Sequence, residues 1–275
     1  MAGLSLGLSL SYNSLVWTPS GNYVTYNAGD GYPTPGFRLG FPVVYGQHYN
    51  SQTGTYGFLI LMPSGSRVEL RRIGSTNNYE SADSSYWHLV DNGTRTPLVR
   101  STDGTQRSYP STDNGFHCMQ VKDRNGNFIF ITNSSAGRPL TISDTLGRVF
   151  NLNYDSNNNL TAISPTRRTG QHTWLTFGYT NLTLQSNFAG LSLIGTQNYT
   201  TLPVLMQVGL PDGTYFKFSY NTCGQVYKIK NYAADSNFKC GSDAHNFSRR
   251  IVGKLLDGAG RVRAIAAEHP GSIGG

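Results

Sequence analysis

The feature that most constrains this chain is a glycine-marked unit that recurs in register along its middle. The stretch DTLGRVFNLNYDSNNNLTAIS, residues 144–164, has its turn glycine at Gly147. Gly126 precedes that glycine by 21 residues, and Gly213 follows it by 66 residues, which is three times 22. A weaker copy is centred on Gly104, 22 residues before Gly126. Because a fixed period indicates a repeat architecture, we interpret the chain as an array of similar units.

Each unit has the pattern of a β-hairpin. Positions three, five and seven after the glycine have a period of two, which places them on one face of a strand. In the three good copies they are Ile129, Ile131 and Asn133, then Phe150, Leu152 and Tyr154, then Phe216, Phe218 and Tyr220. Position eleven tolerates the positive φ of a hairpin loop, and it is occupied by Gly137, Asn158 and Gly224. Position sixteen is an apolar anchor on the returning strand, occupied by Ile142, Ile163 and Ile229.

A lone hairpin is not stable in water, so successive hairpins have to pair edge to edge or curl over a common interior. We therefore expect an all-β fold in which repeated β-hairpins form a curled β-strip. An ordinary β-sandwich would explain the alternation but not the matched offsets. Charged residues make up only 13% of the chain, whereas Tyr (17) and Phe (13) are plentiful, which favours strands over surface helices.

The first 60 residues have a different residue pattern from the array. LSLGLSLSYNS alternates Leu with Ser or Gly, which predicts a strand, while NAGDGYPTPGFRLGFP is rich in turn residues. We predict an N-terminal β segment over residues 1–60 and hairpin repeats over 61–275, degenerate near 166–203. The Asp-x-x-Gly-Arg opening restarts at Asp257 and then stops, so the array is expected to be truncated at its C-terminus. The exposed edge of a last hairpin would favour edge-to-edge self-association.

The unit resembles the YD repeat of the RHS-repeat family, which has an Asp-x-x-Gly-Arg opening, a Tyr-Asp pair, a Gly or Asn turn and a Leu-x-x-Ile close. The best copy carries the match at Asp144, Gly147, Arg148, Tyr154, Asp155, Leu160 and Ile163. A second copy keeps Asp212, Gly213, Tyr220, Gly224, Val226 and Ile229 but has Asn221 in place of Asp. A third keeps Asp123, Gly126, Gly137 and Ile142 but has Asn133 in place of Tyr.

The resemblance implies a shell. In this family the hairpins form a long β-strip that spirals into a hollow shell, found in polymorphic toxins, insecticidal toxin complexes and teneurins. It implies that the chain is a non-enzymatic structural fragment of an RHS/YD-repeat shell that encloses a C-terminal polypeptide, often a toxin, or mediates cell contact. The implied partners are the remainder of the same polypeptide or an enclosed cargo, and the implied location is extracellular or on a bacterial cell surface. The repeat residues then have structural roles, with Tyr154 and Tyr220 forming an aromatic ladder.

Enzymatic and metal sites find little support in the sequence. GLSLG matches a nucleophile elbow around Ser5, but only two residues precede it, too few for the strand that such an elbow requires. The His117–Cys118 pair and the set Cys223, Cys240 and His245 lack the spacing of a zinc site. We therefore predict no catalytic residue, no cofactor and no metal. Cys223 and Cys240 could pair as a disulfide.

The charge and the aromatic content limit the classes of partner that the chain is expected to bind. The net charge is +7, but the basic residues are scattered with no run of five, which argues against a nucleic-acid partner. The sequence contains no run of about 18 apolar residues, so we predict no transmembrane segment. No export signal is visible at the N-terminus. The alternative function is a secreted β-rich module that binds glycans through surface aromatics such as Trp17, Trp87 and Trp174, since aromatic rings can stack on sugars.

Overall fold

The fold is all-β wherever the chain can be described. The computed structural model describes residues 8–27, 31–51, 54–63, 66–93, 96–112, 115–166, 173–195, 198–233, 250–253 and 265–268. Within these ranges no residue lies in a helix, so none contributes to a helix long and apolar enough to cross a membrane. The predicted fold class, repeated hairpins in a curled β-strip, is confirmed.

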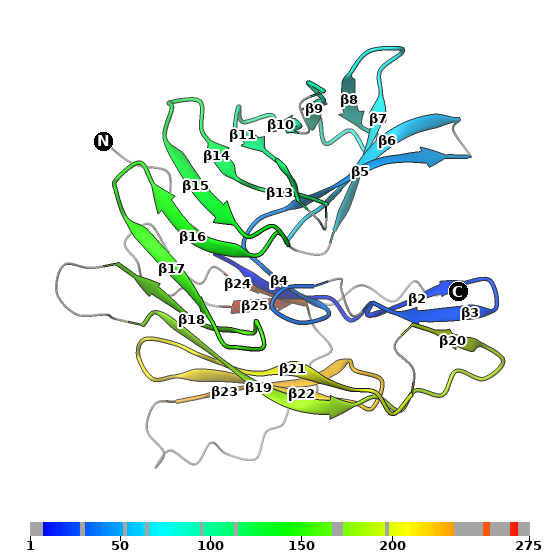
Figure 1. The fold of residues 1–275 in the computed structure, drawn as a ribbon, viewed down its shortest axis with the longest axis vertical. Helices are drawn as coiled ribbons and strands as arrows, with labels where there is room; N and C mark the ends of the chain where they lie inside the picture. The colour runs from blue at the N-terminus through cyan, green and yellow to red at the C-terminus, as the bar shows by residue number, and fades with distance from the viewer. Residues whose placement is uncertain are drawn as a thin grey trace.

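Eighteen strands pair in one antiparallel sheet, called the strip below (Figure 1). Its first strands are β12 (Ser111–Thr112), β13 (Gly115–His117), β5 (Val43–Asn50), β6 (Thr55–Leu61), β7 (Arg67–Arg72), β8 (Asn78–Ser81), β9 (His88–Val90), β10 (Leu98–Arg100) and β11 (Gln106–Ser108). It continues through β14 (Gln120–Lys122), β15 (Phe128–Asn133), β16 (Pro139–Asp144), β17 (Val149–Tyr154), β18 (Leu160–Pro165), β19 (Leu175–Thr183), β21 (Thr201–Gly209), β22 (Tyr215–Tyr220) and β23 (Val226–Tyr232).

The strip departs from sequence order at one place. The short β12–β13 hairpin pairs with β5, while β11 pairs directly with β14 across the base of that hairpin. Among the described strands no pairing joins β12 to β23, so the strip has two ends. Strands β5 and β6, which lie almost wholly within residues 1–60, are part of this same sheet.

Seven turns of the strip share one geometry. The N–H of the fourth residue donates to the carbonyl of the first, and the N–H of the first donates to the carbonyl of the fifth. The fourth residue has positive φ, from 63° at Asn158 to 85° at Gly126. This is a type I turn followed by a left-handed residue, which a glycine or asparagine adopts most easily. The fourth residues are Gly104, Gly126, Gly137, Gly147, Asn158, Gly213 and Gly224.

Side chains on one face of the strip form the core. Strands β15 and β17 bury their second and fourth residues, as alternation predicts, so the buried side is called the inner face and the opposite side the outer face. The inner-face residues of this stretch include Ile129, Ile131, Ile142, Phe150, Leu152 and Ile163, which are all less than one tenth exposed. Burial of such side chains contributes about 1.5–3 kcal/mol each.

The N-terminal segment lies against the inner face. Strands β1 (Leu10–Tyr12) and β4 (Phe37–Leu39) pair with each other and belong to the same buried cluster as the strip core. Figure 1 shows β4 surrounded by the curl of the strip. All three residues of β1 are buried, including Ser11, so both faces of this strand are covered. Residues 8–16 and 31–39 are called the plug below.

Two smaller sheets complete the fold. Strands β2 (Trp17–Ser20) and β3 (Tyr23–Tyr26) form a hairpin, and β3 pairs in parallel with β20 (Ser192–Ile194), which lies in the degenerate region. Strands β24 (Arg250–Gly253) and β25 (Ile265–Glu268) pair with each other, and β24 lies next to β1. The restarted opening at Asp257 lies outside the described residues.

Candidate functional site: the inner face and its plug

Aromatic rings join the plug to the last hairpin of the strip. The ring of Phe37 lies 4.9 Å from that of Tyr12 within the plug and 5.0 Å from that of Phe218 on β22, measured between centroids. The contact with Phe218 is edge to face, with an interplanar angle of 73°. Phe37 is fully buried, which makes it the apolar anchor of the plug.

Hydrogen bonds tie the plug to β21 and to the last hairpin of the strip. The Tyr12 hydroxyl accepts from the N–H of Val226 at 2.8 Å, and Thr34 Oγ1 accepts from the N–H of Leu205 at 3.4 Å. The Ser14 carbonyl accepts from Gln225 Nε2 at 3.0 Å. These contacts span 171 to 214 residues of sequence, so only the folded strip brings the partners together.

A tyrosine pair closes the plug onto the best-preserved repeat. The hydroxyls of Tyr32 and Tyr154 are 2.5 Å apart. Tyr154 donates its proton to the carbonyl of Pro139 at 2.6 Å, so Tyr32 is the donor between the two hydroxyls. The chain Tyr32–Tyr154–Pro139 therefore connects plug, β17 and β16 with every hydroxyl proton used.

The last residue of the first strand makes the same kind of hydrogen bond in three hairpins. Tyr154 donates to the carbonyl of Pro139 and Tyr220 to that of Leu205, each 15 residues earlier and at 2.6 Å. In the third hairpin Asn133 Nδ2 donates to the carbonyl of Cys118, also 15 residues earlier, at 3.0 Å. The shared offset identifies this position as a side-chain donor to the backbone 15 residues before it. Sequence reasoning identified the aromatic residues there but not this hydrogen bond.

Burial keeps the tyrosines of the inner face protonated. Desolvation raises the pKa of Tyr154 to about 12 and also raises the pKa of Tyr12, Tyr179 and Tyr220. The pKa of Tyr32 is raised by desolvation and by its neighbour Tyr154. A neutral phenol can both donate and accept a hydrogen bond. These tyrosines therefore act as hydrogen-bonding groups within the fold.

Turn carboxylates also have structural roles. Asp155 accepts hydrogen bonds from the N–H groups of Asn157 and Asn159 at 2.9 and 2.8 Å. Asp144 accepts the equivalent bonds from Leu146 and Arg148 and is nearly fully buried beside the Arg148 guanidinium. Hydrogen bonds, first from the Asn159 side chain, lower the pKa of Asp155. Asp144 and Asp155 thus brace the turns at the two ends of β17 in the same way.

The remaining repeat residues occupy turns or the core. Gly126, Gly147 and Gly213 lie at exposed turns, and a Cβ added at Gly126 or Gly147 would meet nothing within 4 Å. Gly137 and Gly224 are buried against other elements, namely the His117 ring and the Tyr26 and Leu184 side chains. Ile142 and Ile163 are fully buried, and Ile229 is half-buried opposite Phe218. Asp212 accepts from the N–H and hydroxyl of Thr214.

Nucleophilic and metal-ligating side chains do not gather into a centre in the described part of the chain. Cys118 is buried, and desolvation raises the pKa of its thiol to about 12, so it stays protonated. No group of three or more metal-ligating side chains occurs among the described residues. Ser5, Cys240 and His245 lie outside the described residues, and the pairing of Cys223 with Cys240 stays a prediction.

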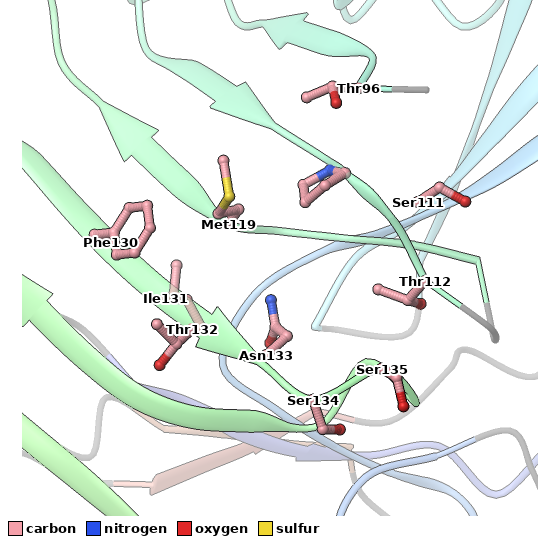
Figure 2. Close-up of a pocket in the computed structure, with 11 residues that line it drawn as sticks. Thr96, Ser111, Thr112, Met119, Phe130, Ile131, Thr132, Asn133, Ser134 and Ser135 are labelled. Atoms are coloured by element: carbon pink, nitrogen blue, oxygen red, sulfur yellow. The ribbon is translucent and has the colours of Figure 1, made fainter. Parts of the chain in front are cut away.

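A pocket lies where the β12–β13 hairpin leaves the strip (Figure 2). Its volume is about 760 Å³, and it is lined by hydroxyl, amide and apolar side chains that include Thr96, Ser111, Met119, Phe130 and Asn133. The lining residues contain no Asp, Glu, His, Lys or Arg. Because Asn133 lines the pocket, the pocket lies beside the repeat copy that has Asn in place of Tyr. No side chain of the lining is an acid or a base.

The plug is the part of this site that sequence reasoning missed. Tyr12, Tyr32, Thr34 and Phe37 lie in an N-terminal segment outside the repeat period, so no offset marks them. The alternation of LSLGLSLSY predicts a strand with one polar face, whereas β1 is buried on both faces. The curled strip, β4 and β24 all lie beside β1, so its burial on both faces depends on the tertiary fold.

Similarity to known proteins is found among solved structures. No protein-family model and no curated protein matches the chain. The crystal structure of TcdB2-TccC3-TEV is similar over 86% of this chain and 14% of that chain, with 10% identity and a TM-score of 0.27. A structure of the Photorhabdus luminescens Tc holotoxin pore with a TccC3 mutation is similar over 88% of this chain and 14% of that chain, with 12% identity and a TM-score of 0.25. The chain therefore spans only 14% of the length of each matched chain.

Proposed function

We propose that this chain is a non-enzymatic wall segment of an RHS/YD-type hairpin-repeat shell whose inner face holds polypeptide. One observation carries the proposal: the inner face already encloses an extended segment, the plug, through backbone and hydroxyl hydrogen bonds and the Phe37 anchor. A wall that encloses a cargo needs the same kind of contacts. The neutral, protonated tyrosines supply them without any catalytic group.

The resemblance extends the proposal beyond the described residues. The enclosed cargo would be a C-terminal polypeptide, often a toxin, and the partner would be the remainder of the same polypeptide. A bacterial, extracellular or cell-surface location follows from the same resemblance, with cell contact as the second role. The strand edge of β23 would pair with a further hairpin or with another copy of the strip.

The glycan-binding alternative receives less support from its tryptophans. Trp17 is half-buried, donates to the carbonyl of Cys223 at 2.8 Å and packs against Tyr26. Trp174 is half-buried 4.4 Å from the Phe150 ring, and Trp87 lies under the Arg107 guanidinium. All three therefore have packing roles within the fold.

The proposal can be tested by emptying the inner face of the full chain. The double variant Phe37→Asp with Leu39→Asp removes the apolar anchors of the plug. We expect it to bind a fluorescent peptide of residues 1–40 with a micromolar dissociation constant, measured by anisotropy. The unchanged chain should not bind the peptide because its own plug occupies the face. A scrambled peptide of the same composition is the control.

Two outcomes would contradict the proposal. If the variant keeps its β-sheet circular dichroism but binds the peptide no better than the scrambled control, the inner face does not hold a separate polypeptide. If the variant loses its β signal altogether, plug and strip fold only as one unit, and a wall that needs its own plug has no room for cargo.

A further inference from the structure

The outer face of the last described hairpin gathers like charges. Lys217 on β22 lies directly opposite Lys230 on β23, and Lys228 lies opposite Ser219 on the same face. Side chains directly opposite in an antiparallel pair have Cβ atoms about 5 Å apart, and like charges there destabilise the pair. Lys217 and Lys230 are exposed and Lys228 is half-buried. Strands β22 and β23 therefore hold three ammonium groups within mutual reach.

No acidic side chain of the surrounding strands offsets this charge. Strands β19, β21, β22 and β23 contain no Asp or Glu. The nearest acidic residues along the chain are Asp212 in the preceding turn, whose carboxylate accepts bonds from Thr214, and Asp235, which lies outside the described residues. Elsewhere on the strip the pattern differs, since Arg71 lies opposite Glu80 and 3.3 Å from Glu69. Among the described residues, the strands around these lysines thus lack the counter-charges that β7 and β8 have.

Two tyrosines extend the basic surface. Tyr215 and Tyr232 are opposite each other, with ring centroids 4.7 Å apart and an interplanar angle of 7°. On its other side Tyr215 lies opposite Gly209 of β21, which has no side chain to cover the ring. The lysine patch is defined as Lys217, Lys228, Lys230, Tyr215 and Tyr232. It combines cationic donors with a pair of stacked, half-buried aromatic rings on the outer face.

We infer that the lysine patch binds an acidic polysaccharide, a chain of sugars that carries sulfate or carboxylate groups. Lysine ammonium groups suit such anions because they need no planar, bidentate geometry. Sugar rings pack their C–H faces on aromatic side chains, which the tyrosine pair supplies. A bound anion between Lys217 and Lys230 would also offset their repulsion. This inference concerns the outer face and does not depend on the cargo role of the inner face.

A nucleic acid fits the surface less well than a glycan. Non-specific binding of a duplex draws on many phosphate contacts from basic residues spread along a track. The patch has three lysines on one hairpin, and the chain has no run of five basic residues to extend it. A compact cluster beside an aromatic pair matches one or two charged sugar units instead.

The test measures binding of the full chain to four polymers by isothermal titration: heparin as a sulfated chain, polygalacturonate as a carboxylated chain, dextran as a neutral chain, and single-stranded DNA. We expect heparin or polygalacturonate to bind and dextran not to bind. The preference between heparin and polygalacturonate identifies which anion the patch takes. The double variant Lys217→Gln with Lys230→Gln should weaken acidic-glycan binding at least tenfold.

A matched control and a second variant separate the patch from net charge and from folding. Lys122→Gln with Arg124→Gln removes the same charge from exposed residues elsewhere on the strip and should leave binding within twofold. Lys230→Glu places an acid opposite Lys217, so it should raise the Tm while it abolishes binding. A variant that gains stability and loses binding cannot have lost binding through unfolding.

Three results would overturn the inference. The first is no binding to either acidic glycan. The second is an equal loss in the control pair, which would assign the binding to overall charge. The third is DNA binding as tight as glycan binding with the same dependence on Lys217 and Lys230, which would make the patch a site for phosphate polymers.

Discussion

The hairpins β15–β16 and β17–β18 are built alike but carry residues of different chemistry at the end of their first strand. Both first strands have six residues, the same alternation of burial, and a register shift before their last residue. That residue is Asn133 in one and Tyr154 in the other, and each donates to a carbonyl 15 residues earlier. Only Tyr154 also reaches the plug, through Tyr32. The donor bond is thus common to the repeat, whereas the link to the plug requires the aromatic side chain.

The largest expected effect comes from removing that aromatic ring. Tyr154→Ser should lower the free energy of unfolding by about 3 kcal/mol, because it removes ring burial and two hydrogen bonds. Asn133→Ser should cost only about 1 kcal/mol, the net value of one hydrogen bond. Urea unfolding followed by tryptophan fluorescence measures both. Equal losses would mean that the ring adds nothing beyond the shared donor bond.

The turns at the two ends of β15 should respond unequally to the same substitution. Gly137→Ala should cost about 2 kcal/mol and Gly126→Ala about 1 kcal/mol, since both residues have positive φ. The difference arises because a Cβ on Gly137 would overlap the His117 ring, whereas nothing lies within 4 Å of one on Gly126. The shift in thermal midpoint of each variant measures this. A larger effect at Gly126 would contradict the packing of Gly137.

The smallest expected effect is a difference in alkaline stability. The pKa of Tyr154 is raised by desolvation from an ordinary value of 10.0 to about 12. The unfolded chain therefore releases this proton first, so the contribution to stability is complete below pH 10 and is lost as the pH rises toward 12. Tyr154→Phe should make the fall of stability between these values shallower, measured by urea unfolding at several pH values.

Asn133 provides the control for this pH dependence because an amide does not titrate. Asn133→Ser should lower stability equally at pH 8 and pH 11 and leave the slope between them unchanged. A slope that is identical in Tyr154→Phe and the unchanged chain would show that Tyr154 is not desolvated in the folded state.

The repeat and its turns were predictable because they depend on neighbours in sequence. Gly147 and Asn158 meet a local need for positive φ, and Asp144 and Asp155 bond to N–H groups two and four residues on. The apolar position sixteen residues after the turn glycine likewise marked Ile142 and Ile163 as anchors of the returning strand, and both are buried. These features follow from nearby residues in the sequence, so the offsets from each turn glycine were enough to predict them.

The plug, the pairing of the β12–β13 hairpin with β5 and the lysine patch were not predictable in this way. Tyr32 lies 122 residues from Tyr154, and no period links them. The pairing of β13 with β5 and the meeting of Lys217 with Lys230 depend on strand register across the sheet.

The sequence by itself determined an all-β array of hairpins and the residues of its turns, because backbone conformation and alternation are local properties. Only the tertiary structure decided how far the strip curls and what fills it. Burying the apolar inner face required a cover, and the chain supplies one from its own N-terminus, where the alternating Leu and Ser of β1 are covered on both faces.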